Sequence, residues 1–204
     1  MWNDTVIDVI RKAPGPQLDL SVFKLGCFPL TTIEERRKSL AQLLSKLKYL
    51  EPAARSALVH EIGVRENMQP AHDLMMTSEQ VSAMSAAGMT IGAHTMRHPI
   101  LARIPEDEAR TEMAEGKARL EAIVGHEVTL FAYPNGKPGT DYAPAHVRLA
   151  REVGFTAACS TGWGTATAGS DMFQLPRFTP WDKSRVRYAL RLAMNMRHPS
   201  TQLN

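Results

Sequence analysis

The chain has 204 residues, of which 44% are hydrophobic, and this composition argues against a disordered protein. Its 24 lysines and arginines nearly balance its 21 aspartates and glutamates, so the net charge of +3 gives no indication of a nucleic-acid partner. No stretch approaches the roughly 18 apolar residues that a membrane span requires. The first residues lack a basic segment followed by an apolar one, and without such a signal peptide we expect a cytoplasmic protein.

The first 76 residues are predicted to form a helical segment. Thr32 and Glu35 fit a capping box, after which leucines recur at helical spacing. Pro52 ends this helix and is suited to begin the next one, for which Gly63 is the predicted end. No segment before residue 77 has the pattern of a strand, so this part is expected to be helical and irregular.

Residues 77–204 alternate between predicted helices and strands. Each predicted helix begins with a capping residue or a proline and is followed by glycine, and the ranges are 77–87, 105–124 and 144–153. The predicted strands are short apolar runs at 89–93, 128–132, 155–159 and 173–178. Such alternation predicts an α/β fold with a mainly parallel sheet, although three or four strands are too few to close a barrel.

Two histidines, His94 and His98, lie four residues apart directly after the first predicted strand. Histidine is a common zinc ligand, and this spacing allows both rings to reach one ion. Pro99 disfavours helical dihedral angles at His98, so we expect the pair on a loop or a single turn. The pattern predicts a metal site, and the alternative is a polar pair that caps a turn.

A second motif, Tyr133-Pro134-Asn135-Gly136, follows the next predicted strand. Adjacent parallel strands would bring this turn and the histidine pair to the same edge of the sheet. In α/β folds that edge is where ligands bind. The two motifs are therefore predicted to form one site.

The order of these motifs, His94-Thr95-x-x-His98-Pro99 and then Phe131 to Gly136, resembles the polysaccharide deacetylase family with its NodB homology domain. The resemblance covers roughly residues 74–197, including Leu175-Pro176-Arg177-Phe178. It implies a distorted (β/α) barrel, of which residues 77–204 are the C-terminal part and residues 1–76 a helical segment or insertion. It also implies a metal-dependent hydrolase that removes N-acetyl groups from amino-sugar carbohydrates.

The resemblance implies roles for individual residues. His94 and His98 would be ligands of a divalent metal, usually zinc, and Thr95 would brace their loop. The backbone N–H of Asn135 would help to hold the oxyanion of the reaction, and Tyr133 and Pro134 belong to the same catalytic motif. The chemistry agrees, because amide hydrolysis needs a polarised carbonyl and a stabilised tetrahedral intermediate.

One family motif has no counterpart, because Thr-Phe-Asp-Asp supplies the general base and the third metal ligand and this chain contains no Asp-Asp pair. We therefore expect a C-terminal portion of the domain with impaired activity, whose missing strands lie upstream or on a separate chain. The candidate substitute ligands are Asp141, Asp171, Asp182 and Glu79. The candidate general acids are His146 and His126, although each fits a surface or helix position better.

Two alternatives remain open from the sequence. The chain could be a non-catalytic relative that binds sugars or a partner chain. It could also be a peripheral binding protein that uses its basic C-terminal segment, in which an apolar stripe at helical spacing is flanked by arginines, although an ordinary docking helix shows the same pattern. Trp163 and Trp181 fit either a sugar-stacking surface or the core.

Overall fold

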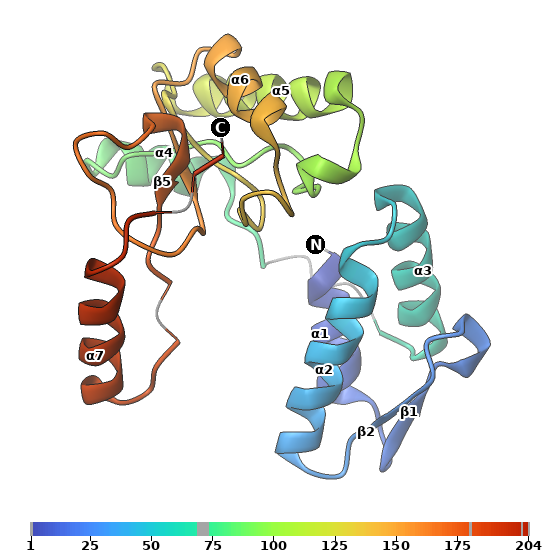
Figure 1. Cartoon of the computed structure of the whole chain (residues 1–204). Helices are drawn as coiled ribbons and strands as arrows, with labels where there is room; N and C mark the ends of the chain where they lie inside the picture. The colour runs from blue at the N-terminus through green and yellow to red at the C-terminus, as the bar shows by residue number, and fades with distance from the viewer. Residues whose placement is uncertain (1, 69–73, 180, 201, 204) are drawn as a thin grey trace. The chain divides into compact units, whose positions relative to one another are not determined.

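The computed structural model describes residues 2–68, 74–179, 181–200 and 202–203, and the chain divides into two compact units, residues 1–76 and 77–204 (Figure 1). Each unit contains its own cluster of buried apolar side chains. No described helix combines the length and the apolar character that crossing a bilayer requires.

The first unit consists of three helices and a small hairpin. Helix α1 (Trp2–Lys12) packs against α2 (Ile33–Lys48) and α3 (Pro52–Arg65). The capping box predicted at Thr32 is present, because its hydroxyl accepts a hydrogen bond from the Glu35 N–H while the Glu35 carboxylate accepts one from the Thr32 N–H. The core of this unit includes Val6, Val9, Ile10, Leu18, Phe28, Leu43, Leu47 and Ile62.

Two expectations for this unit are wrong. Strands β1 (Gln17–Asp19) and β2 (Cys27–Pro29) pair antiparallel, although no strand was expected before residue 77. Each strand has three residues, of which only the middle one is buried, and so short a run shows no alternating pattern. Gly63 lies inside α3 instead of ending it, and a Cβ there would lie 3.1 Å from Cγ2 of Thr5. A side chain at this position would therefore crowd Thr5 of α1.

The second unit is an α/β structure, as the sequence predicted. Its parallel sheet has the order β3 (Leu130–Ala132), β4 (Ala157–Ser160) and β5 (Leu175–Pro176), and the described residues form no closed barrel. Figure 1 shows α5 (Glu106–Val124) beside α6 (Pro144–Glu152), with α7 (Arg185–Met196) projecting from the opposite side of the unit. The remaining elements are α4 (Ser78–Ala86) and short 3₁₀ turns at Leu101–Arg103 and Met172–Gln174.

The predicted helix boundaries hold closely in this unit. Thr77 and Gln80 form the capping box of α4, and Gly125 ends α5 with a left-handed φ of 76°. Acidic residues fill the first turn of α5, where the positive end of the helix dipole stabilises them. These boundaries depend on local backbone chemistry, which the sequence contains in full.

The strand expected at 89–93 is not formed. Only Ala93 pairs, through a single parallel bridge to Phe131, in which its N–H donates to Leu130 O at 2.8 Å and its carbonyl accepts from Ala132 N at 2.9 Å. The chain leaves extended geometry two residues later, because Thr95 has a φ of 61°. The bridge nevertheless places this segment beside β3, so it occupies the position of a fourth strand.

The two faces of the sheet differ in burial. Ala93, Phe131 and Ala158 form one row across the strands and are buried with residues of α5 and α6. The next row is His94, Ala132, Cys159 and Leu175, whose side chains are exposed or half-buried on the other face. The histidine pair thus begins on the less covered face of the sheet.

Candidate active site

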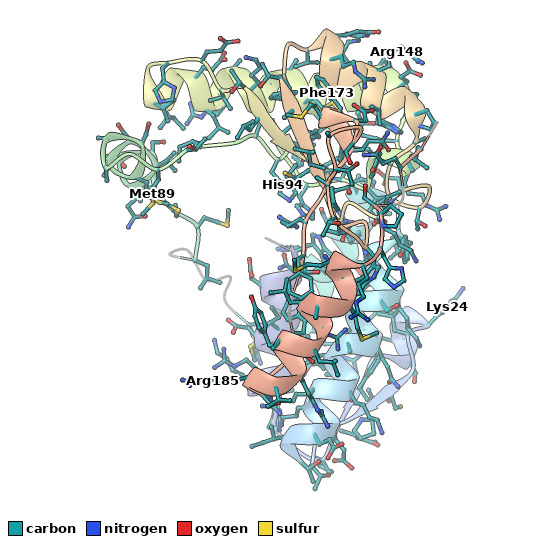
Figure 2. The ribbon with its side chains drawn as sticks, turned by 60° about the vertical axis from the view of Figure 1, so that its left-hand side comes forward. Lys24, Met89, His94, Arg148, Phe173 and Arg185 are labelled. Atoms are coloured by element: carbon teal, nitrogen blue, oxygen red, sulfur yellow. The ribbon has the colours of Figure 1, made fainter. Side chains whose placement is uncertain are left out.

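The loop from His94 to His98 brings the two imidazoles together. Their ring centroids are 4.7 Å apart and the ring planes meet at 75°. Thr95 and His98 both have left-handed φ values, 61° and 58°, which make the turn tight. The Thr95 hydroxyl donates to His94 O at 2.6 Å and accepts from His98 N at 3.1 Å, so it braces the loop. The position of His94 is labelled in Figure 2.

The orientation of the His94 ring is fixed by a strand carbonyl. Its Nδ1 lies 2.6 Å from Ala132 O, and because a carbonyl can only accept, Nδ1 carries the proton and the lone pair is on Nε2. Loss of water around the ring lowers the pKa of His94, although the residue as a whole is exposed. The positive charge of Arg177 lowers this pKa further. The neutral imidazole with a free Nε2 lone pair is the form that binds a metal.

Helix α5 contacts the histidine loop through two residues, Glu112 and Gly116. The buried carboxylate of Glu112 accepts hydrogen bonds from Met96 N at 3.0 Å and Arg97 N at 2.8 Å, and also from the Arg97 side chain. One turn later, Gly116 lies so close to Thr95 that a Cβ there would be 3.0 Å from the Thr95 carbonyl carbon. Glu112 and Gly116 therefore fix the distance between the histidine loop and helix α5.

The side chain of Tyr133 belongs to the core. It is buried, stacks on Tyr142 with centroids 4.0 Å apart, and donates its hydroxyl proton to Phe173 O at 2.9 Å. Burial raises the pKa of Tyr133, so the hydroxyl keeps its proton. Pro134 is buried as well. These two residues begin the turn that follows β3, and the Tyr133 side chain packs in the core.

Asn135 lies in a strained turn at the edge of the sheet. Its φ is 59° and that of Gly136 is 73°. Thr161 holds this turn from β4, since its hydroxyl donates to Asn135 O and its N–H donates to Gly136 O, both at 2.8 Å. The Asn135 N–H finds no acceptor among the residues that the structure describes. It is therefore available as a donor to a bound molecule.

The candidate third ligands do not join the histidines. Asp141 accepts from Lys137 N, Asp171 pairs with Arg151, Asp182 pairs with Arg191, and Glu79 lies in the first turn of α4. Within the described ranges no group of three or more His, Cys, Asp or Glu side chains could hold a metal ion. His94 and His98 are thus two candidate ligands without a third among the described residues.

The two histidines considered as general acids serve other elements. Nδ1 of His146 accepts from Ala143 N at 2.9 Å and so caps α6, and burial lowers the pKa of this side chain. His126 lies on the surface, with Nε2 2.8 Å from the Ser85 hydroxyl. Neither histidine contacts the loop that carries His94. Trp163 and Trp181 are exposed, by 42% and 88% respectively.

The sequence motifs did not single out Glu112, Gly116 or Arg177 as residues of the site. Glu112 and Gly116 lie in the predicted helix 105–124, for which the sequence indicated only the two ends. Arg177 belongs to the Leu175-Pro176-Arg177-Phe178 motif, but nothing in its spacing connects it to His94. Only the packing of α5 and the order of the strands bring these residues to the histidines.

A family model described as polysaccharide deacetylase matches residues 42–158, which is more than half of the chain. The chain belongs to the polysaccharide deacetylase family. The match begins within α2 and ends in β4, so it includes residues of both compact units. It also contains both sequence motifs of the site described above.

The relatives agree with this assignment. The protein YxkH of Bacillus subtilis (strain 168), whose name places it among the polysaccharide deacetylases, is 26% identical over 106 residues, which are 52% of this chain and 37% of YxkH. The solved Streptococcus pyogenes deacetylase PplD, in complex with acetate, has a TM-score of 0.53 at 20% identity over 70% of this chain and 65% of its own.

A solved polysaccharide deacetylase from Bacillus cereus has a TM-score of 0.51 at 18% identity, and the similarity covers 70% of this chain and 46% of that protein. At these identities the structural comparisons establish the α/β fold. The chain spans less than two thirds of the length of each of these three relatives.

Proposed function

We propose that the chain carries part of a metal-dependent carbohydrate deacetylase that removes N-acetyl groups from amino sugars. The observation that carries the proposal is the contact between the His94 and His98 rings at the sheet edge, with Nδ1 of His94 held by Ala132 O. Family membership supports the reaction class. The specific substrate and the metal dependence are the proposed part.

The two imidazoles can supply two of the ligands of zinc or a similar divalent ion. The hydrogen bond from Nδ1 to a backbone carbonyl is the arrangement that normally orients a metal-binding histidine. A catalytic zinc usually has three protein ligands, however, and the described residues supply no third. We therefore propose that metal binding by this chain is weak and that its activity is impaired.

The residues around the pair suit amide hydrolysis. A divalent ion, when bound, supplies Lewis acidity that polarises the acetyl carbonyl. The Asn135 N–H is fixed by the Thr161 hydrogen bonds and can donate to the oxyanion that develops on that carbonyl. One such preorganised donor contributes about 3 kcal/mol to stabilisation of the transition state. Glu112 and Gly116 hold the backbone of the loop that carries the histidines.

Zinc titration of the purified chain tests the proposal. We expect one zinc ion to bind weakly to each chain and this binding to be lost in both His94→Ala and His98→Ala, because each removes one of two nitrogen ligands. His126→Ala is the matched control, since this surface histidine lies against Ser85, and it should bind zinc normally. Acetate release from N-acetylglucosamine oligomers is then measured with zinc present. Zinc binding that persists in both site variants would disprove the assignment of the ligands.

A non-catalytic carbohydrate-binding protein is the second candidate, and the lack of a third ligand among the described residues favours it. This candidate predicts binding of N-acetylglucosamine oligomers without acetate release at any zinc concentration. The idea of a separate chain that supplies missing strands has no support in the comparisons, and neither candidate requires it.

A further inference from the structure

Arg177 lies on the same face of the sheet as His94, and each residue is at the C-terminal end of its own strand segment. Its N–H donates to Ser160 O at 3.0 Å, which continues the pairing of β5 with β4 by one residue beyond Pro176. Leu175 is in the row of Cys159, Ala132 and His94, and side chains two residues apart on a strand share a face. Arg177 therefore shares the less covered face with His94.

Arg177 and His94 lie on the two outer segments of the parallel sheet. Three strand spacings of about 4.8 Å separate the backbone of β5 from that of the His94 segment. The positive charge of Arg177 also lowers the pKa of His94, although burial of the ring is the larger cause. The two residues thus lie on the face of the sheet that also carries Ala132 and Cys159.

Among the described residues no carboxylate pairs with Arg177, whereas five other arginines of the same unit have acidic partners. Arg97, Arg110, Arg148, Arg151 and Arg191 all pair with carboxylates. Within the part of the chain that the structure describes, Arg177 has no ion pair, and it is exposed. An exposed guanidinium that no carboxylate occupies, beside a proposed reaction centre, is suited to bind an oxyanion in bidentate fashion.

We propose that Arg177 is a specificity-determining residue that binds a carboxylate or phosphate group of the carbohydrate ligand beside the histidine pair. The inference rests on the proposed function for the carbohydrate, and it adds that an acidic sugar is preferred to a neutral one. The shared chemistry of the two groups is a planar or tetrahedral oxyanion that accepts two N–H bonds. The binding itself requires neither a metal nor turnover.

The experiment compares three matched sugars, glucose, glucuronate and glucose 6-phosphate, added to the metal-free full chain. Binding is followed by NMR at the amide of Thr161, which is the neighbour of Arg177 across the strands. We expect the two acidic sugars to bind at least fivefold more tightly than glucose, and the better of the two identifies the preferred anion. Equal binding of all three sugars would overturn the proposal.

Variants of Arg177 assign the effect to its side chain. Arg177→Gln should weaken binding of the acidic sugar at least fivefold, and Arg177→Lys should recover part of it, because lysine keeps the charge without the planar fork. Arg119→Gln is the control, since Arg119 is an exposed arginine on α5 that lines a surface hollow against α4. Unchanged binding in Arg177→Gln, or an equal loss in Arg119→Gln, would disprove the role.

The outcome is separable from the proposed deacetylation. If the chain binds the acidic sugars through Arg177 but releases no acetate from any oligomer, the reaction fails and the anion site stands. If acetate is released while Arg177→Gln binds both acidic sugars as the parent chain does, the reaction stands and the anion site fails. Circular dichroism of each variant shows whether it is folded.

Discussion

His94 owes its binding geometry to a backbone carbonyl of a neighbouring strand. The spacing of His94 and His98 in the sequence indicated a shared ligand, but it did not reveal which ring nitrogen would be available. The hydrogen bond from Nδ1 to Ala132 O decides this, and it exists because Ala93 pairs with Phe131 one residue earlier. The same neighbours place Tyr133 in the core, although its position in the motif suggested a catalytic role.

Gly116→Ala is predicted to disturb the histidine loop. The new Cβ would lie 3.0 Å from the Thr95 carbonyl carbon, and because that neighbour is backbone it must move by a few tenths of an ångström. We expect a loss of about 1–3 kcal/mol in unfolding free energy from overpacking. Zinc affinity should fall about 10–100-fold, as for other changes that misplace a ligand.

Hydrogen exchange at the amides of Met96 and Arg97, which bond to Glu112, reports the loop directly. Gly125→Ala is the control, because that left-handed position has open space around it and is distant in sequence from the loop. It should cost about 1–2 kcal/mol of stability without changing zinc affinity. Normal exchange and affinity in Gly116→Ala would contradict the role of this close approach.

Tyr133→Phe is predicted to affect stability and not chemistry. The change removes the hydrogen bond to Phe173 O and leaves the ring stack on Tyr142 in place, so unfolding free energy should fall by about 1–2 kcal/mol. Acetate release per folded molecule should stay within about twofold of the parent, whereas a hydroxyl that took part in proton transfer would contribute roughly 10²-fold or more. Chemical denaturation and a turnover assay measure the two effects.

The sequence predicted the helices more accurately than the strands. Helix ends are marked by local signals, such as the capping boxes at Thr32 and Thr77 and the glycine at 125. The observed ends lie within one residue of the predicted ones at these positions. The hairpin of β1 and β2 was missed, and the strand expected at 89–93 pairs only at Ala93. Strand pairing depends on partners that are distant in the chain, so a short apolar run does not determine it.

Thr32→Ala is predicted to destabilise the first unit alone. Loss of the side-chain oxygen leaves the Glu35 N–H without its cap, which costs about 1 kcal/mol. Hydrogen exchange should quicken for amides of α2 and remain unchanged for those of α5 and α6, which belong to the other core. Thr32→Ser keeps the capping oxygen and should behave as the parent chain does. Equal quickening in both units would show that they unfold together.

At the scale of the whole molecule, the site depends on the sheet of the second unit having one well-covered face and one less covered face. The covered face is held by aromatic side chains, in which Phe131 packs on Phe155 and on Tyr133, and Tyr133 stacks on Tyr142. The other face carries the row that includes His94. Family membership and the α/β fold are established, whereas the described residues leave the barrel open.

Alkaline pH is predicted to destabilise the second unit through its buried tyrosines. Burial raises the pKa of Tyr142 to about 12, above the value near 10 of an unfolded chain, so the folded state retains a proton that the unfolded state releases. The contribution of the protonated form is complete below pH 10 and is lost as the pH rises toward 12. Tyr142→Phe should weaken this dependence between pH 10 and 12, as measured by urea denaturation at several pH values.

The sequence by itself determined the α/β class and most helix ends, because these depend on composition, capping chemistry and spacing within one segment. It also predicted the two motifs of the candidate site and indicated the family to which the chain belongs. The tertiary structure alone decided which face His94 occupies and that Tyr133 is a core residue. It also decided that Glu112 and Gly116 contact the histidine loop and that Arg177 shares a sheet face with His94. Those facts depend on strand order and on helix-to-loop packing, and such contacts between distant segments arise only when the chain has folded.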